Sequence, residues 1–347
     1  MSTGMRYFAR HFRSSLIRLA VMVLFSSVIC FYFSVNHWYT GVTDVYTVSL
    51  SVHSLIMMIL TYVLPAAEFD AFKNRRNLDL WMSSPLSRTS LIVSNIVNGA
   101  IQMLITHSAA GLAVIIRMLV YNGAGAGLRV HNAVIFLLMS LPVLLAVYLF
   151  NCAVFMIGNC RLDGIIFILL YSILPAMLSG VVEMVKRCLV FKYEYDYDGA
   201  VRSGYSVISK LSEVYSRQSG PVITSDRQLA PLSGRYSITS GDMAWYMIWI
   251  AIGIASLVLA VVYFKRLRPE KVGGPSTNFF GYTFLLPAAG YSFLIMASTA
   301  GLIVSLLIMM AMFLGYVIFR KGFSFRLPDI ICMGIAVLMV IVFKITL

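Results

Sequence analysis

The residues of this chain best suited to reversible ionic contacts lie in one charged segment, residues 68–88. The segment reads EFDAFKNRRNLDLWMSSPLSR and separates two long apolar stretches. If it is helical, Phe69 and Phe72 share one face and basic side chains fill the gaps, which predicts a short amphipathic helix lying along a surface. Such a helix suits the docking of a soluble partner. The alternative is a solvated loop whose charges only set the topology.

Known catalytic patterns are absent from the sequence. There is no G-x-x-x-x-G-K-[ST] phosphate-binding loop and no H-E-x-x-H pair. The five cysteines are scattered, without a C-x-x-C pair, which argues against a disulfide framework and against a zinc site. We therefore expect a chain that is not an enzyme and that binds no metal or cofactor of its own.

Several polar residues fall inside apolar stretches, where polar groups are functional candidates by default. They are His53, Asn98, Gln102, His107, Arg117 and Asn151. No carboxylate is expected near the middle of a span, so an ion-coupled carrier is not favoured. We expect His107 to form a hydrogen bond between helices and Arg117 to extend toward the outer surface. If the protein transports a substrate, a partner should supply the energy.

Composition shows which solvent surrounds these elements. The chain has 347 residues, of which 60% are hydrophobic and 12% charged, and its mean hydropathy is +0.86. A water-soluble domain of this length cannot hide so much apolar surface, and the apolar runs are too long and continuous for barrel strands. The fold class predicted is therefore all-α, a polytopic helical bundle in a lipid membrane. The net charge of +13 is concentrated in short loops, so it does not indicate a nucleic-acid partner.

The apolar stretches predict nine spans. The residues 282–319 are too long for one span, and we expect a hairpin turning near 298–299. The predicted spans are 19–35, 47–67, 91–121, 133–157, 164–182, 244–264, the two arms of that hairpin, and 330–343. Lysine and arginine concentrate in the short segments on one side, which predicts a cytoplasmic N-terminus. The chain stops soon after its last span, so we expect it to be part of a longer protein.

A polar, tyrosine-rich stretch over residues 183–242 is predicted to be an extracytoplasmic loop. Val207, Leu211, Val214 and Tyr215 recur at helical spacing, which predicts a short amphipathic helix within the loop.

Two runs of residues resemble a known family. Residues 72–79, FKNRRNLD, followed by SSPLSR at 83–88, are similar to the segment before the third span of ABC-2 type permeases, the membrane subunits of ATP-binding-cassette exporters. Residues 263–273, YFKRLRPEKVG, resemble the end of the sixth span in that family. The resemblance implies a six-span permease core over 1–275, followed by a helical hairpin and a final span over 276–347.

The same resemblance implies that the segment 68–88 couples the spans to an ATPase. The coupling residues it suggests are Glu68, Phe69, Phe72, Lys73, Arg75, Arg76, Asp79 and Trp81. It implies a permease in the cytoplasmic membrane that moves a substrate outward, paired with a second permease of the same or another kind. ATP and Mg would be bound by a separate cytosolic ATPase subunit. The alternative is a membrane sensor or scaffold whose loop 183–242 binds a ligand. A lipid-modifying enzyme is less favoured, because carboxylate and histidine clusters are missing.

Overall fold

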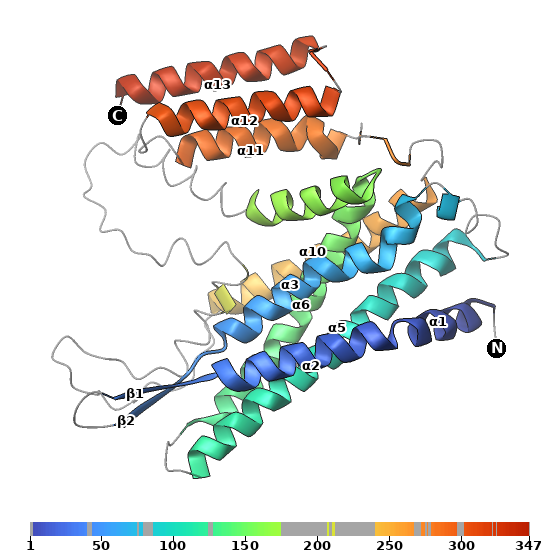
Figure 1. The fold of residues 1–347 in the computed structure, drawn as a ribbon, viewed down its shortest axis with the longest axis vertical. Helices are drawn as coiled ribbons and strands as arrows, with labels where there is room; N and C mark the ends of the chain where they lie inside the picture. The colour runs from blue at the N-terminus through green and yellow to red at the C-terminus, as the bar shows by residue number, and fades with distance from the viewer. Residues whose placement is uncertain are drawn as a thin grey trace. The chain divides into compact units, whose positions relative to one another are not determined.

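The computed structural model describes most of the chain (Figure 1). The described residues are 3–39, 44–74, 76–78, 86–123, 128–174, 207, 210–211, 240–266, 272–274, 276, 279–296, 302–320, 322–323 and 325–346. In this part of the chain six helices are long and apolar enough to cross a membrane. They are Leu16–Phe33, Ser51–Lys73, Arg88–Gly123, Val130–Ile157, Ser240–Lys265 and Leu302–Arg320. The prediction of an all-α, multi-pass membrane protein is confirmed at this level.

The chain forms two compact units that alternate along the sequence. Unit 1 comprises Met1–Met156 and Val207–Glu270, and unit 2 comprises Ile157–Ser206 and Lys271–Leu347. The residue resemblance instead places a boundary near residue 275. Each unit is described separately below.

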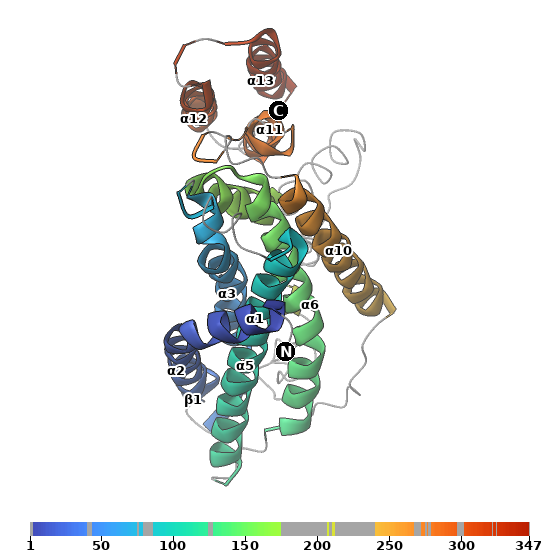
Figure 2. The same ribbon diagram turned by 90° about the vertical axis from the view of Figure 1, so that its right-hand side faces the viewer.

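Unit 1 is built around its longest helix, α5 (Arg88–Gly123). Its 36 residues span about 54 Å, well beyond a hydrocarbon core of about 30 Å. α5 packs against α1 (Thr3–Ser14), α2 (Leu16–Phe33), α3 (Ser51–Phe69) and α10 (Ser240–Lys265), as Figures 1 and 2 show. α5 is therefore the element that positions the polar groups of the other helices.

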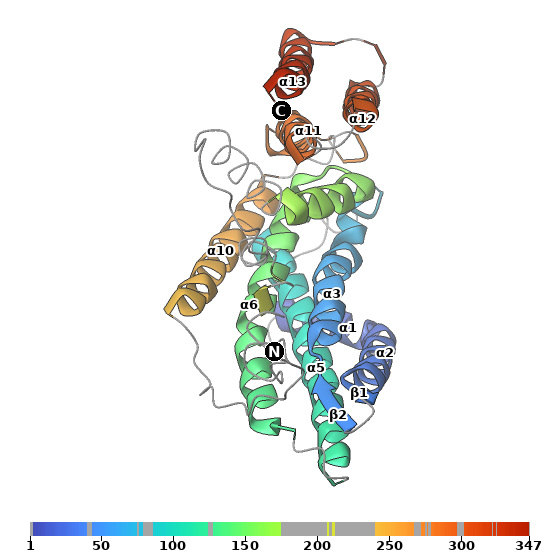
Figure 3. The same cartoon turned by 90° about the vertical axis from the view of Figure 1, so that its left-hand side faces the viewer.

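A two-stranded hairpin joins α2 to α3, where the sequence predicts only a short loop. Strand β1 (Val35–Tyr39) pairs antiparallel with β2 (Asp44–Val48), from Val35 opposite Val48 to Tyr39 opposite Asp44 (Figure 3). The β-branched and aromatic residues of these two runs favour strands, a signal that is weak over five residues. The first span accordingly ends at Phe33, two residues before the predicted end, and it begins at Leu16, three residues before the predicted start.

The helix α6 (Val130–Ile157) is hydrogen-bonded to α3 next to a proline of α3, Pro65. Pro65 has no N–H, so within α3 the carbonyl of Thr61 loses its usual helical donor. The Asn151 amide of α6 donates to that carbonyl at 3.1 Å and to the Thr61 hydroxyl at 3.2 Å. A polar residue inside a predicted span therefore compensates a break in the neighbouring helix.

α6 also approaches α5 closely at a glycine. Tyr148 is fully buried and donates its hydroxyl to the Ile96 carbonyl at 3.1 Å. A Cβ on Gly99 would lie 2.8 Å from Cζ of Tyr148, so only glycine leaves room for that ring. The close approach holds the middle of α5 in a defined position against α6.

Unit 2 contains a helix at 161–174 and three further helices. These are α11 (Phe284–Met296), which follows the π-type turn η3 (Phe279–Thr283), α12 (Leu302–Arg320) and α13 (Leu327–Thr346). Asp163 accepts from the Ser276 N–H at 3.0 Å and from the Tyr282 hydroxyl at 2.7 Å. Arg320 makes a two-point ion pair with Asp329, at 2.8 and 2.9 Å, which joins α12 to α13.

Several span predictions can be compared with these elements. The run 282–319 is two helices, α11 and α12, as expected for a hairpin, although α11 has only 13 residues. The predicted fifth span is described only as far as residue 174. In the long loop, Val207 and Leu211 are helical and buried, while Val214 and Tyr215 lie outside the described residues.

Candidate functional site

Glu68, in the last turn of α3, places a carboxylate in the interior of unit 1. Its side chain has no exposed surface. The Asn98 amide of α5 lies 3.0 and 2.9 Å from its two oxygens, and the Gln102 amide donates to Oε1 at 2.9 Å. A buried charge is tolerated only when it is paired and hydrogen-bonded, and Glu68 meets both conditions.

Two further partners reach Glu68 from the N-terminal helices. The Arg18 guanidinium of α2 donates to Oε1, and His11 Nε2 of α1 lies 2.7 Å from Oε2. Arg18 Nε also donates to the Gln102 side-chain oxygen at 3.1 Å. Glu68 therefore links α1, α2 and α5 to the end of α3 through one carboxylate.

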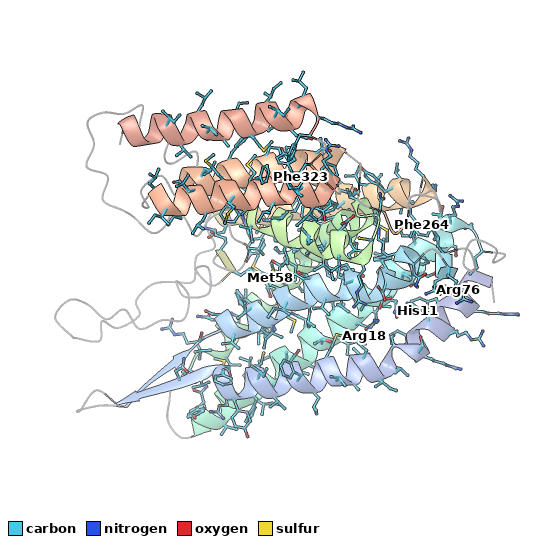
Figure 4. The ribbon with its side chains drawn as sticks, turned by 45° about the horizontal axis from the view of Figure 1, so that its top comes forward. His11, Arg18, Met58, Arg76, Phe264 and Phe323 are labelled. Atoms are coloured by element: carbon cyan, nitrogen blue, oxygen red, sulfur yellow. The ribbon has the colours of Figure 1, made fainter. Side chains whose placement is uncertain are left out.

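A second polar contact holds α1 against α5 beside Glu68. Asn95 donates to the Tyr7 hydroxyl at 3.3 Å and to the Leu91 carbonyl at 2.9 Å. Burial raises the pKa of Tyr7 above its ordinary value, so the hydroxyl stays protonated at neutral pH. We call the set His11, Arg18, Glu68, Asn98 and Gln102 the Glu68 network. His11 and Arg18 lie toward the same end of the unit as Arg76 (Figure 4).

The network follows from helical spacing. On α5, Asn95, Asn98 and Gln102 are three and four residues apart, so their side chains share one face. His11, Ser15 and Arg18 repeat the same spacing across the junction of α1 and α2, and Ser15 accepts from Gln102 at 3.3 Å. Two stripes of polar side chains therefore face each other, and Glu68 supplies the charge between them.

The chain continues from Glu68 into a buried turn, η1 (Asp70–Lys73). Phe69 and Phe72 are buried, and their rings lie 6.5 Å from Phe155 of α6 and 5.1 Å from Phe264 of α10, respectively. Lys73 Nζ donates to the Met156 carbonyl at 3.4 Å. The turn therefore contacts the ends of α6 and α10, the helices that the Glu68 network does not reach.

These contacts differ from the surface helix predicted for the segment. Glu68, Phe69, Phe72 and Lys73 are all buried. The apolar face that the sequence shows, with Phe69 and Phe72, packs against α6 and α10, and Glu68 is covered by α1, α2 and α5. Arg76 is exposed. Arg75, Asp79 and Trp81 lie outside the described residues. Of the predicted residues that the structure describes, four are buried and contact other helices, and Arg76 is exposed.

Sequence reasoning did not place His11 and Arg18 in the site. It identified Asn98 and Gln102 only as polar residues inside an apolar stretch. The 4-and-3 spacing of His11, Ser15 and Arg18 would have revealed a polar stripe, but nothing in the sequence says that this stripe meets Glu68. The expected inter-helix bond of His107 is confirmed, with Nε2 lying 3.0 Å from the Leu137 carbonyl.

The network is suited to holding and moving helices rather than to chemistry on a substrate. Its groups are a carboxylate whose oxygens all have hydrogen-bond partners, two amides, one guanidinium and one imidazole. In the described residues no three His, Cys, Asp or Glu side chains lie close enough to hold a metal ion together. No family model, curated protein or solved structure matches this chain.

Proposed function

We propose that this chain is the permease subunit of an ATP-binding-cassette transporter, driven by ATP hydrolysis on a separate cytosolic subunit. One observation carries the proposal. The short stretch from Glu68 to Lys73 contacts α1, α2 and α5 through Glu68, α6 through Lys73, and α10 through Phe72. A displacement of this stretch would therefore act directly on the other helices described in unit 1.

The physical requirement for such a subunit is a rigid connection between a docking surface and the spans. Phe69 and Phe72 are packed in the interior, and the oxygens of Glu68 all have hydrogen-bond partners, so the stretch is held rigidly. Closely packed interiors transmit displacement from one element to the next. In this proposal the docking surface follows immediately, at the exposed Arg76. The arrangement supports a division of labour in which residues 68–73 transmit motion and the basic residues beyond them bind the ATPase.

Orientation follows from charge. Arg6, Arg10 and Arg13 are exposed on α1, and Arg76 is exposed near the same end of the unit. By the positive-inside rule this end lies in the cytoplasm, where an ATPase would be. The proposal places the chain in the cytoplasmic membrane beside a second permease, with outward transport of a substrate whose class the residues do not indicate.

The test is affinity purification of the tagged chain from membranes of its native host in mild detergent, followed by mass spectrometry. We expect a stoichiometric ATPase with a phosphate-binding loop to accompany the wild-type chain. Charge reversal of Arg75 and Arg76 together (R75E/R76E) should remove the ATPase and leave the amount of chain in the membrane unchanged. Reversal of Arg129 (R129E), on the predicted outer side, is the matched control and should retain it.

Either of two results would count against the proposal. Normal co-purification with R75E/R76E would show that this segment does not dock the ATPase. A wild-type preparation that repeatedly lacks any ATPase would exclude the permease function and favour the membrane sensor.

A further inference from the structure

Two histidines meet inside the bundle, away from the Glu68 network. The rings of His53 (α3) and His107 (α5) have centroids 4.8 Å apart and planes at 69°. The two residues are 1% and 4% exposed. Neither ring nitrogen of His53 has a hydrogen-bond partner, and neither does Nδ1 of His107. Buried polar groups without a partner are unfavourable in an apolar interior, so these nitrogens are candidates for binding a ligand.

His107 makes one side-chain hydrogen bond, through Nε2, and this bond determines that its other nitrogen, Nδ1, is not protonated. With Nε2 donating to the Leu137 carbonyl at 3.0 Å, Nδ1 carries a lone pair and is free to coordinate. A backbone carbonyl behind one imidazole nitrogen is the arrangement that orients metal-ligating histidines in many proteins.

Two methionines lie one helical turn from these histidines. Met57 follows His53 by four residues on α3, and Met103 precedes His107 by four on α5. The two helices run in opposite directions, since His53 meets His107 while Glu68 meets Asn98, so both methionines fall on the same side of the histidine pair. Both are fully buried. Two imidazoles therefore meet where α3 faces α5, and two buried thioethers lie one turn away on the same helices.

The spacing of the rings suits a metal ion. With metal–nitrogen bonds of about 2 Å, two imidazoles at neighbouring corners of a tetrahedron have ring centres about 5 Å apart, close to the 4.8 Å separation. The remaining two corners are then open to the sulfur atoms. All four ligands are neutral, so they do not compensate the charge of the ion. The desolvation free energy of a monovalent ion is much smaller than that of a divalent one, which favours a monovalent ion here.

We propose that His53, His107, Met57 and Met103 form a binding site for a soft monovalent cation, Cu(I) or Ag(I). Thioether and imidazole ligands without a carboxylate favour such ions over Zn(II) or Mg(II). The site rests on contacts within α3, α5 and α6 and does not depend on the proposed coupling to an ATPase.

The test uses the purified full chain in detergent under anaerobic, reducing conditions. Cu(I) is titrated in competition with bathocuproine disulfonate, and Ag(I) is counted by elemental analysis after desalting. Because free thiols such as Cys160 and Cys332 also bind Cu(I), the relevant quantity is the difference between variants. We expect H53L to lose one equivalent of Cu(I) relative to the wild type.

The thioethers are tested with M57L/M103L, a pair of nearly isosteric changes that should preserve folding. This variant should bind Cu(I) at least tenfold more weakly, and the sulfur scattering in its X-ray absorption spectrum should fall relative to the wild type. Met58, labelled in Figure 4, is the adjacent buried methionine, and M58L should match the wild type. Equal Cu(I) binding by the wild type and H53L, or sulfur scattering unchanged in M57L/M103L, would overturn the proposal.

Discussion

Replacing Glu68 with glutamine should weaken the attachment of the N-terminal helices α1 and α2 to the bundle. The substitution removes the charge that neutralises Arg18 and puts an amide donor where His11, Asn98 and Gln102 already donate. Breaking a buried ion pair costs about 3–5 kcal/mol. Arg18 is 30% exposed and regains some hydration, so we take the lower value, about 3 kcal/mol.

Trypsin can measure this weakening directly, because Arg10 and Arg13 are exposed on α1 and a helix must open before it is cut. When opening is fast relative to cleavage, the rate follows the population of the open form. A loss of about 3 kcal/mol then speeds cleavage after these arginines by roughly 100-fold. Mass spectrometry of the digest in detergent identifies the cuts.

A matched control separates local opening from general loss of stability. Asp242 is also a buried carboxylate in unit 1, and it pairs with Lys210 at 3.1 Å. D242N should leave cleavage within α1 near the wild-type rate. The reasoning fails if E68Q is cut no faster than the wild type, or if D242N accelerates the same cuts equally. In a double-mutant cycle, E68Q and R18Q should cost less together than the sum of the two.

Two further substitutions test the packing that positions α5 and α3. G99A should displace the buried ring of Tyr148 and lower the free energy of unfolding by about 1–3 kcal/mol, whereas G123A, at the open end of the same helix, should not; equal denaturation midpoints for the two would contradict the assigned contact. N151L should cost about 1–3 kcal/mol, because Pro65 leaves the Thr61 carbonyl without another donor in α3; an unfolding curve identical to that of the wild type would show that the carbonyl finds a different partner.

Much of the helical framework is predictable because it depends on short-range pattern. The apolar helices α2 and α6 are long enough to cross a membrane, and their bounds agree with the predicted spans to within a few residues. The β1–β2 hairpin was not predicted, because five-residue strands carry little periodic signal and β1 follows an apolar helix in the sequence with only one residue between them.

The sequence alone determined that this is a helical, multi-pass membrane protein and that a charged segment separates α3 from α5. It also marked Asn98, Gln102 and His107 as polar groups needing partners. Only the tertiary structure decided that Glu68 faces the interior and that His11 and Arg18 reach it from other helices. The reason is physical. A hydrophobic or amphipathic pattern states which face of a helix avoids water, but the rotation and register of one helix against another come from side-chain packing across contacts far apart in the chain.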